Sequence, residues 1–300
     1  MLYYRLKLVA DLPKFENPVL LYGFTGFLEA GHAVRIAAEH ILANVEHEVV
    51  AEFDIDAVFD YRARRPRLSF STDHYSAADL PRLSIYACRD ERGAGFFVLH
   101  GVEPDFGWRS IIKDIKTFVR EVEVSLSVSM LAVPFPAPHT RPVPVTAHAN
   151  RPELLKGRTS WLGDMEVPGS LSGLLEFQLG ESDMPAMGFA AHVPHYLANL
   201  NHPASALALV REVSLATGLM LPTDSLREAA QAADRELAEQ LQANPENLEG
   251  IQQLEAQYDA LAAERAGNEA GPDFSAHTDD IAAQVEQFLA QMETRGKGDE

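Results

Sequence analysis

One stretch of the chain alternates like a strand and then runs into five prolines. From Ser127 to Met130, polar and apolar side chains alternate, as they do in a β-strand with one buried face. Prolines follow at positions 134, 136, 138, 142 and 144. Each proline fixes φ and removes a backbone donor, so regular strand pairing has to stop or move to a sheet edge. The sequence therefore predicts a buried strand that ends in a stiff, extended loop displaying His139, Thr140 and Arg141.

A second apolar run, residues 186–191, leads into similar chemistry, since His192, Pro194, His195 and Tyr196 follow it. In an open α/β sheet, ligands and partners usually sit at the carboxyl ends of the strands. We expect the two runs to be parallel neighbours. Their ends would then bring five polar side chains together at one edge of the sheet: His139, Arg141, His192, His195 and Tyr196.

The remaining pattern is that of an α/β protein. A short apolar strand at residues 19–22 is followed by Gly23, Gly26 and Gly31 and by an alanine-rich helical stretch, which is the opening of a βα unit. The glycine spacing is not G-x-G-x-x-G, so we interpret these glycines as allowing a tight turn and close helix packing, rather than as a phosphate loop. Further strands and helices fit segments on both sides of the proline loop: 49–56, 68–71, 83–86, 96–99, 110–124, 170–177 and 204–217.

Charge divides the chain at about residue 222. The net charge of the whole chain is −19, yet residues 223–300 alone hold 18 acidic and 5 basic side chains. Apolar residues at helical spacing in this acidic part predict helices around 226–237, 248–261 and 281–292. We therefore expect an α/β core domain over residues 1–222 and an acidic helical extension over 223–300. An excess of negative charge also argues against nucleic acid or an anionic membrane as the main partner.

Other features favour structural interpretations. Cys88 is the only cysteine and lies in an apolar run, which is typical of a buried, inert thiol. The clustered basic run Asp60–Arg67 is interpreted as a solvated surface loop, with an anion or acidic-partner clamp as the alternative. Neither a signal-peptide layout nor a membrane-spanning window is found, so a cytoplasmic protein is expected.

Four short motifs, taken in order, resemble the proteasome assembly chaperone 2 family in its actinobacterial form. The resemblance covers roughly residues 17–222. Its carriers are Leu21–Gly26 with Gly31, Gly101–Pro104 with Trp108, Pro138–Pro142, and Val193–Tyr196 with Pro203.

The resemblance implies an α/β fold similar to purine nucleoside phosphorylases, with a central mixed sheet flanked by helices. It also implies homo-oligomers, with a trimer expected for this branch, and proteasome subunits as partners. The family's eukaryotic members are non-enzymatic chaperones that assemble the proteasome α-ring. Those chaperones dock through a C-terminal hydrophobic-tyrosine-any residue tail, whereas this chain ends Arg295-Gly296-Lys297-Gly298-Asp299-Glu300. Any contact with a proteasome is therefore expected to use another surface.

Two functions remain open from the sequence. A protein-binding scaffold needs only a stable core and exposed rigid loops, and we expect it to use His139, Thr140, Arg141, Trp108, His195 and Tyr196. A small-molecule enzyme with a phosphorylase-like or hydrolytic pocket would use His139, Arg141, His192, His195 and Tyr196 as base and anion clamp. We favour the scaffold because no catalytic motif is found, and we expect no cofactor and no metal site.

Overall fold

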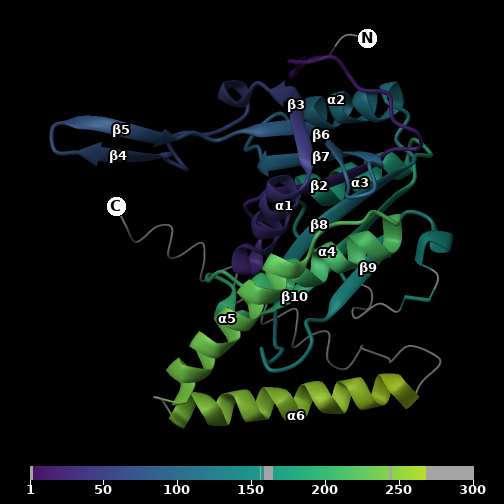
Figure 1. Cartoon of the computed structure of the whole chain (residues 1–300). Helices are drawn as coiled ribbons and strands as arrows, with labels where there is room; N and C mark the ends of the chain where they lie inside the picture. The colour runs from purple at the N-terminus through teal and green to yellow at the C-terminus, as the bar shows by residue number, and fades with distance from the viewer. Residues whose placement is uncertain (1–2, 156, 159–164, 243–244, 268–300) are drawn as a thin grey trace.

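An eight-stranded mixed sheet forms the centre of the computed structural model, which describes residues 3–155, 157–158, 165–242 and 245–267 (Figure 1). The strand order is β1-β3-β6-β7-β2-β8-β10-β9, in which β7, β2, β8 and β10 are parallel and the outer strands pair antiparallel. The strands of this sheet are β1 Leu6–Leu8, β2 Val19–Thr25, β3 Glu46–Phe53, β6 Leu83–Arg89, β7 Gly95–Val102, β8 Leu126–Phe135, β9 Val145–Ala149 and β10 Ala186–Pro194. A separate pair is formed by β4 Arg67–Ser71 and β5 His74–Asp79.

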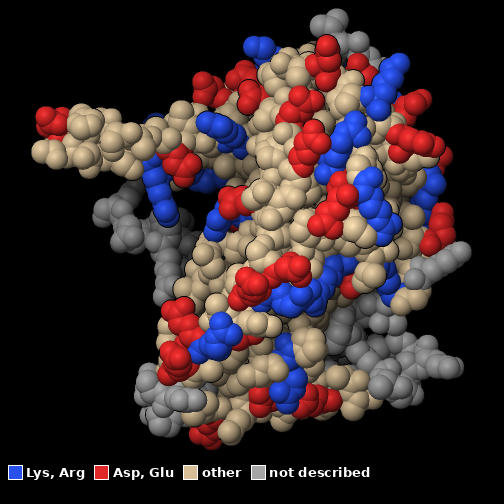
Figure 2. All heavy atoms as spheres, viewed as in Figure 1, with Lys and Arg blue, Asp and Glu red and all other residues tan. Residues whose placement is uncertain are grey.

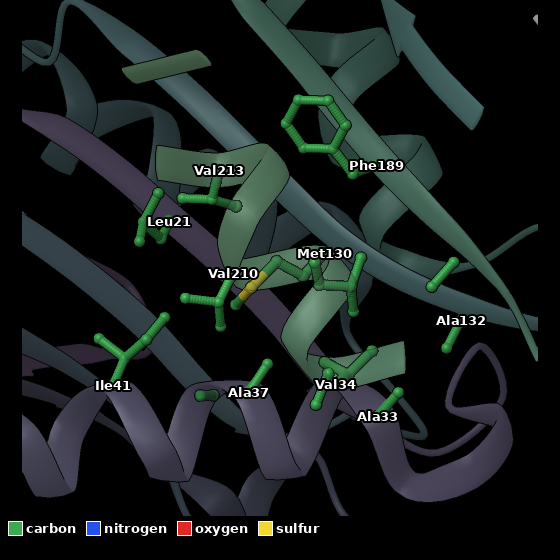
Figure 3. Packing of buried hydrophobic residues seen from close by; sticks show 14 of the residues in the cluster. Leu21, Ala33, Val34, Ala37, Ile41, Met130, Ala132, Phe189, Val210 and Val213 are labelled. Carbon is green, nitrogen blue, oxygen red and sulfur yellow. The ribbon is translucent and has the colours of Figure 1, made fainter. Parts of the chain in front are cut away.

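Helices cover both faces of the sheet, which confirms the predicted α/β fold (Figure 1). One hydrophobic cluster packs β2 and β8 against α1 (Ala33–Asn44) and α4 (Pro203–Thr217), as Figure 3 shows. The other packs the sheet against α2 (Trp108–Glu121) and α3 (Leu171–Gly180). Because successive strand residues point to opposite faces, Leu21 belongs to the first cluster and Leu20 and Tyr22 to the second. Short 3-10 turns complete the core: η1 Ala30–His32, η2 Ile55–Ala57, η3 Pro152–Leu155 and η4 His195–Leu197.

Gly23, which lies inside β2, and Gly31, which follows it, serve helix packing, as the sequence predicted. A Cβ on Gly23 would lie 2.6 Å from Val34 Cγ1, so the missing side chain lets α1 approach the sheet. Gly31 has a φ of +64°, and a Cβ there would lie 2.8 Å from the Cβ of His202. This position therefore needs both the left-handed conformation that glycine tolerates and its small size.

Pro134 lies inside β8 rather than after it, because the strand continues to Phe135. On one side Pro134 pairs with Val193 of β10. On the other side the pairing of β8 with β2 has already ended at Ser129, apart from a bond in which the Ala132 N–H donates to the Leu28 carbonyl at 3.0 Å. N–H groups two residues apart in a strand point the same way, so the donor that Pro134 lacks would face the side where β2 has ended.

One strand prediction was wrong in part, and another is confirmed. Residues 54–56 do not extend β3, because the chain turns into η2 and buries Ile55, Val58 and Phe59 against the α2 side of the sheet. Apolar side chains three and four residues apart meet in a turn, whereas they would point to opposite faces of a strand. Residues 68–71 do form a strand, but it lies outside the main sheet.

Strands β4 and β5 form a two-stranded arm, residues 67–79, that projects away from the body (Figure 1). Every residue of both strands is exposed. Phe70 and Tyr75 face each other across the arm with ring centroids 5.2 Å apart, and their exposed fractions are 61% and 70%. Figure 2 shows the visible surface of the arm mostly in tan, with few charged atoms.

The C-terminal extension begins with α5 (Asp224–Gln242) and α6 (Pro245–Gly267), which confirms two of the three predicted helices. Helix α5 continues from the body next to α4 and buries Leu226 and Ala230, and α6 runs back beneath the body (Figure 1). The helix expected at 281–292 and the tail at 295–300 lie outside the described residues.

The structure also bears on the single cysteine and on the search for a membrane-spanning segment. Cys88 is buried as expected, and burial raises the pKa of its thiol to about 12, so it is not a reactive nucleophile. Among the described helices, none combines the length and apolar character that crossing a membrane would require.

We predict that Gly101→Ala destabilises the protein by more than about 3 kcal/mol, because φ at Gly101 is +150° and a Cβ would lie 1.9 Å from the Arg82 carbonyl oxygen. Gly93→Ala is the matched control: its φ is +80°, but no atom lies within 4 Å of its Cβ position. The control should lower the free energy of unfolding, measured by urea denaturation, by about 1 kcal/mol. Equal losses in the two variants would contradict the packing argument.

Candidate functional site

The ends of β8 and β10 lie side by side, as the sequence predicted. The strands pair in parallel from Ser127 with Ala186 to Phe135 with Pro194. The proline loop therefore leaves the sheet next to the turn η4, which starts at His195. We call residues 139–142 and 195–202 together the strand-end rim.

His139 and Tyr196 form the centre of the rim. The backbone N–H of His139 donates to the Tyr196 hydroxyl oxygen at 2.8 Å, and Nδ1 of the same histidine lies 2.8 Å from that oxygen. The hydroxyl can therefore donate to Nδ1, which places the imidazole's own proton on Nε2. Burial lowers the pKa of His139, opposed by Asp234 and Glu255, and burial raises the pKa of Tyr196. Both rings are therefore neutral near pH 7.

His202 is a rim residue that the sequence analysis did not select. It is buried, its Nδ1 lies 2.7 Å from Ser205 Oγ, and its backbone N–H donates to the Gly31 carbonyl at 2.8 Å. Burial, followed by repulsion from His139, lowers its pKa to about 4. The only signal in the sequence is a histidine directly before Pro203 at the start of α4, which reads as an ordinary helix start.

Arg141 is held by α6. Its Nε and Nη2 donate to the two carboxylate oxygens of Asp259 at 2.8 and 2.7 Å, and its Nη1 donates to Glu255 Oε1 at 3.2 Å. Thr140 Oγ1 also bonds Glu255, and the Tyr258 hydroxyl donates to the Pro142 carbonyl at 3.0 Å. The pKa of Asp259 is lowered by its bond to Arg141. The guanidinium is therefore already neutralised by acidic groups four residues apart on one helix.

The other predicted site residues have different surroundings. His195 is exposed beside Tyr196, with ring centroids 5.4 Å apart. His192 does not reach the rim, because it is fully buried in β10, its Nε2 lies 2.9 Å from Thr146 Oγ1, and its ring packs on Phe135 at 4.4 Å. Trp108 is half-buried against the α2 side of the core, and its indole N–H donates to the Pro104 carbonyl at 2.6 Å.

The structure thus brings His139, His195 and Tyr196 together at the rim, where His202 also lies. Arg141 instead binds the acidic side chains of α6. It separates His192 and Trp108 from that group. Within the described ranges, no three His, Cys, Asp or Glu side chains are placed to hold a metal ion.

A carboxyl group lies at the end of the neighbouring strand β2. Glu29 Oε2 accepts from the Gly26 N–H at 3.1 Å, and Arg35 Nε is 4.0 Å from Oε1. Burial raises the pKa of Glu29 from 4.5 to about 7 against these two attractions. The folded protein therefore holds this proton more tightly than the unfolded chain does.

The stability due to Glu29 should consequently be fully present below pH 4.5 and be lost as pH rises through 7. We predict that Glu29→Gln, which removes this loss, stabilises the protein at pH 8 by about 2 kcal/mol, allowing for some solvent screening. At pH 4 it should change little. Urea unfolding at both pH values measures this, with Glu46→Gln at the exposed start of β3 as control. A gain of equal size at both pH values would be inconsistent with a titrating Glu29.

The bond between Arg141 and α6 predicts a second effect. Replacing Arg141 with alanine should increase amide hydrogen exchange in residues 245–267 several-fold, because a network of two carboxylates loses its shared cation. Arg227→Ala is the matched control, since Arg227 contacts only Asp224 and Thr223 within its own helix or at its start. Unchanged exchange in α6 would show that the contact does not hold the helix.

Comparison with known proteins gives a consistent set of relatives. A model of the PAC2 family matches residues 23–241. A Mycobacterium tuberculosis protein of unknown function is 38% identical with a TM-score of 0.88, and the match covers 96% of each chain. A Corynebacterium glutamicum protein of unknown function is 32% identical with a TM-score of 0.82, covering 85% of this chain and 97% of the other. No curated protein matches the chain.

A further solved relative has a name that states a function. A Mycobacterium tuberculosis proteasome-assembly chaperone homologue is 27% identical to this chain with a TM-score of 0.69. The match covers 74% of this chain and 94% of that protein.

Proposed function

The chain belongs to the PAC2 family, and from that membership we propose that it is a non-enzymatic, protein-binding scaffold linked to proteasome assembly. The relative described as a proteasome-assembly chaperone homologue supports this assignment. We place the protein in the cytoplasm, with proteasome subunits and further copies of itself as partners.

The observation that carries the proposal is that the strand-end rim binds a helix. Arg141, Thr140 and the Pro142 carbonyl take up the side chains of Glu255, Tyr258 and Asp259. A bidentate arginine–carboxylate pair beside a tyrosine hydrogen bond is typical of contacts between protein surfaces. The rim is thus suited to recognising a protein partner.

The enzymatic alternative draws on the same rim. His139 and Tyr196 are hydrogen-bonded, and His195 is exposed beside them, so a proton-transferring pair is present. The anion clamp that such an enzyme would need, Arg141, is bound to two carboxylates of α6. The scaffold is therefore the better-supported function.

Affinity purification of the tagged full-length protein from its native cell, followed by mass spectrometry, tests the function. We expect proteasome α-subunits in stoichiometric amounts, and we expect Arg141→Ala to change their recovery, because it alters the rim. Glu46→Gln, on an exposed strand start, serves as control. Turnover of nucleosides or amides that disappears with His139→Ala or His195→Ala would instead establish the enzyme.

We propose that self-association uses the arm. An isolated two-stranded hairpin is marginally stable in water, and this one exposes Leu68, Phe70 and Tyr75 without covering them on its own body. Family membership favours a second copy of the chain as the partner that covers the arm. In a closed ring of three copies, each arm would be buried once. Burial of the arm's aromatic rings would then stabilise both the arm and the assembly.

We predict that the protein elutes as a trimer of 33.0 kDa chains and that Phe70→Ser with Tyr75→Ser shifts it to the monomer. Light scattering coupled to size exclusion measures the mass. Leu215→Ser is the matched control, since Leu215 is 75% exposed on α4 and should leave the mass unchanged. A wild-type monomer, or an arm variant that keeps its mass, would rule out this role for the arm.

A further inference from the structure

Helix α2 carries a row of positive side chains on its solvent face. Arg109, Lys113, Lys116 and Arg120 are separated by four, three and four residues, so they lie on one side of the helix. Together with Thr117 and with Gln178 of α3, they line a groove between the two helices. We call it the basic groove. Because α2 and α3 cover one face of the sheet and α4 the other, this groove is on the side away from α4 (Figure 1).

The charges of the basic groove are not paired directly with acidic side chains of the described residues. Among the residues that the structure describes, none of the four forms an ion pair within 4.0 Å. Lys113 instead places its Nζ 4.9 Å from the centre of the Tyr4 ring. Burial and then repulsion from Arg120 lower the pKa of Lys116, with only a weaker opposing pull from Glu181. Like charges one turn apart destabilise a helix, so this row costs stability in a chain whose net charge is −19.

Two exposed aromatic side chains are close in sequence to residues that line the groove. Phe106, in the loop before α2, is 56% exposed, and Phe177, which precedes Gln178 on α3, is 61% exposed. A free phosphate or another small anion would gain nothing from such rings. Aromatic residues together with arginine are instead enriched where one protein surface binds another.

We propose that the basic groove binds an acidic segment of a partner protein, in which carboxylates meet the row on α2 and apolar side chains contact Phe106 and Phe177. The chain already contains one example of this chemistry, because Arg141 takes two carboxylates of a single helix. A nucleic acid is disfavoured, since the rest of this acidic protein repels a phosphate backbone. The surface differs from the strand-end rim and from the arm, so its test is independent of the proposed function.

The test uses the full-length protein and a fluorescein-labelled peptide of twelve residues, ten glutamates and two phenylalanines. We expect fluorescence anisotropy to show binding that weakens as salt is raised. Lys116→Glu with Arg120→Glu should weaken it about tenfold or more, because attraction turns into repulsion at two positions. Arg62→Glu with Arg65→Glu makes the same charge change on exposed residues elsewhere and should weaken it less than about twofold. Circular dichroism checks that each variant is folded. If the variant with two glutamates unfolds, Lys116→Gln with Arg120→Gln is measured in its place.

Four results would overturn the proposal. The first is absence of peptide binding to the wild type, and the second is equal weakening by the groove and control variants. The third is equally tight binding of a labelled single-stranded DNA of matched charge, which would mark a general polyanion surface. A groove variant that alters the oligomer mass would also overturn it, because the occupant would then be a second copy of the chain.

Discussion

The parallel pairing of β8 with β10 is the constraint on which the rest of this molecule depends. Their register runs unbroken to Phe135 and Pro194, so both chains leave the sheet at the same point. A shift of either strand by one residue would move Met130 or Phe189 from the α1 and α4 cluster to the opposite face of the sheet, where other side chains already pack, so the register is expensive to change. The prolines that follow β8 then stiffen the loop, and the Tyr196 hydroxyl ties that loop to the turn after β10.

Electrostatics separates two surfaces of the same acidic chain. Arg141 on the rim is neutralised from within, because the extension supplies Glu255 and Asp259 at helical spacing. The row of positive side chains on α2 has no such internal acids among the described residues, although the extension is strongly acidic. One basic feature is thus covered by the chain's own helix and the other faces outward. Under the proposed scaffold function, only the outward-facing row would be open to a partner without displacing a helix of the chain itself.

The arm adds a third surface of a different kind. Its exposed side chains include the apolar rings of Phe70 and Tyr75, and its two strands are held together by a single set of backbone hydrogen bonds. A partner that buries these rings would therefore add most to the stability of the arm. The body, by contrast, is stabilised by two hydrophobic clusters on opposite faces of the sheet. Under the proposed self-association, the arm would serve assembly, whereas the two clusters of the body stabilise the fold.

Local order in the sequence was sufficient for much of this fold. The alternation at Ser127–Met130 follows a period of two residues and the apolar face of α2 a period of 3.6, and a single segment displays either period. Helical spacing of apolar residues likewise predicted α5 and α6, the first of which begins at Asp224, close to the change in charge near residue 222. These features depend on neighbours within a few residues, and the sequence by itself determined them.

Tertiary structure alone decided which distant residues meet. His192 and His195 lie three residues apart, yet one is buried against Phe135 and the other is exposed, because β10 ends between them. Arg141 reaches Asp259 across 118 positions, and the row of positive side chains on α2 becomes one wall of a groove only because α3 brings Gln178 beside it. Contacts of this range arise when separate elements pack, and no local periodicity encodes which elements those will be.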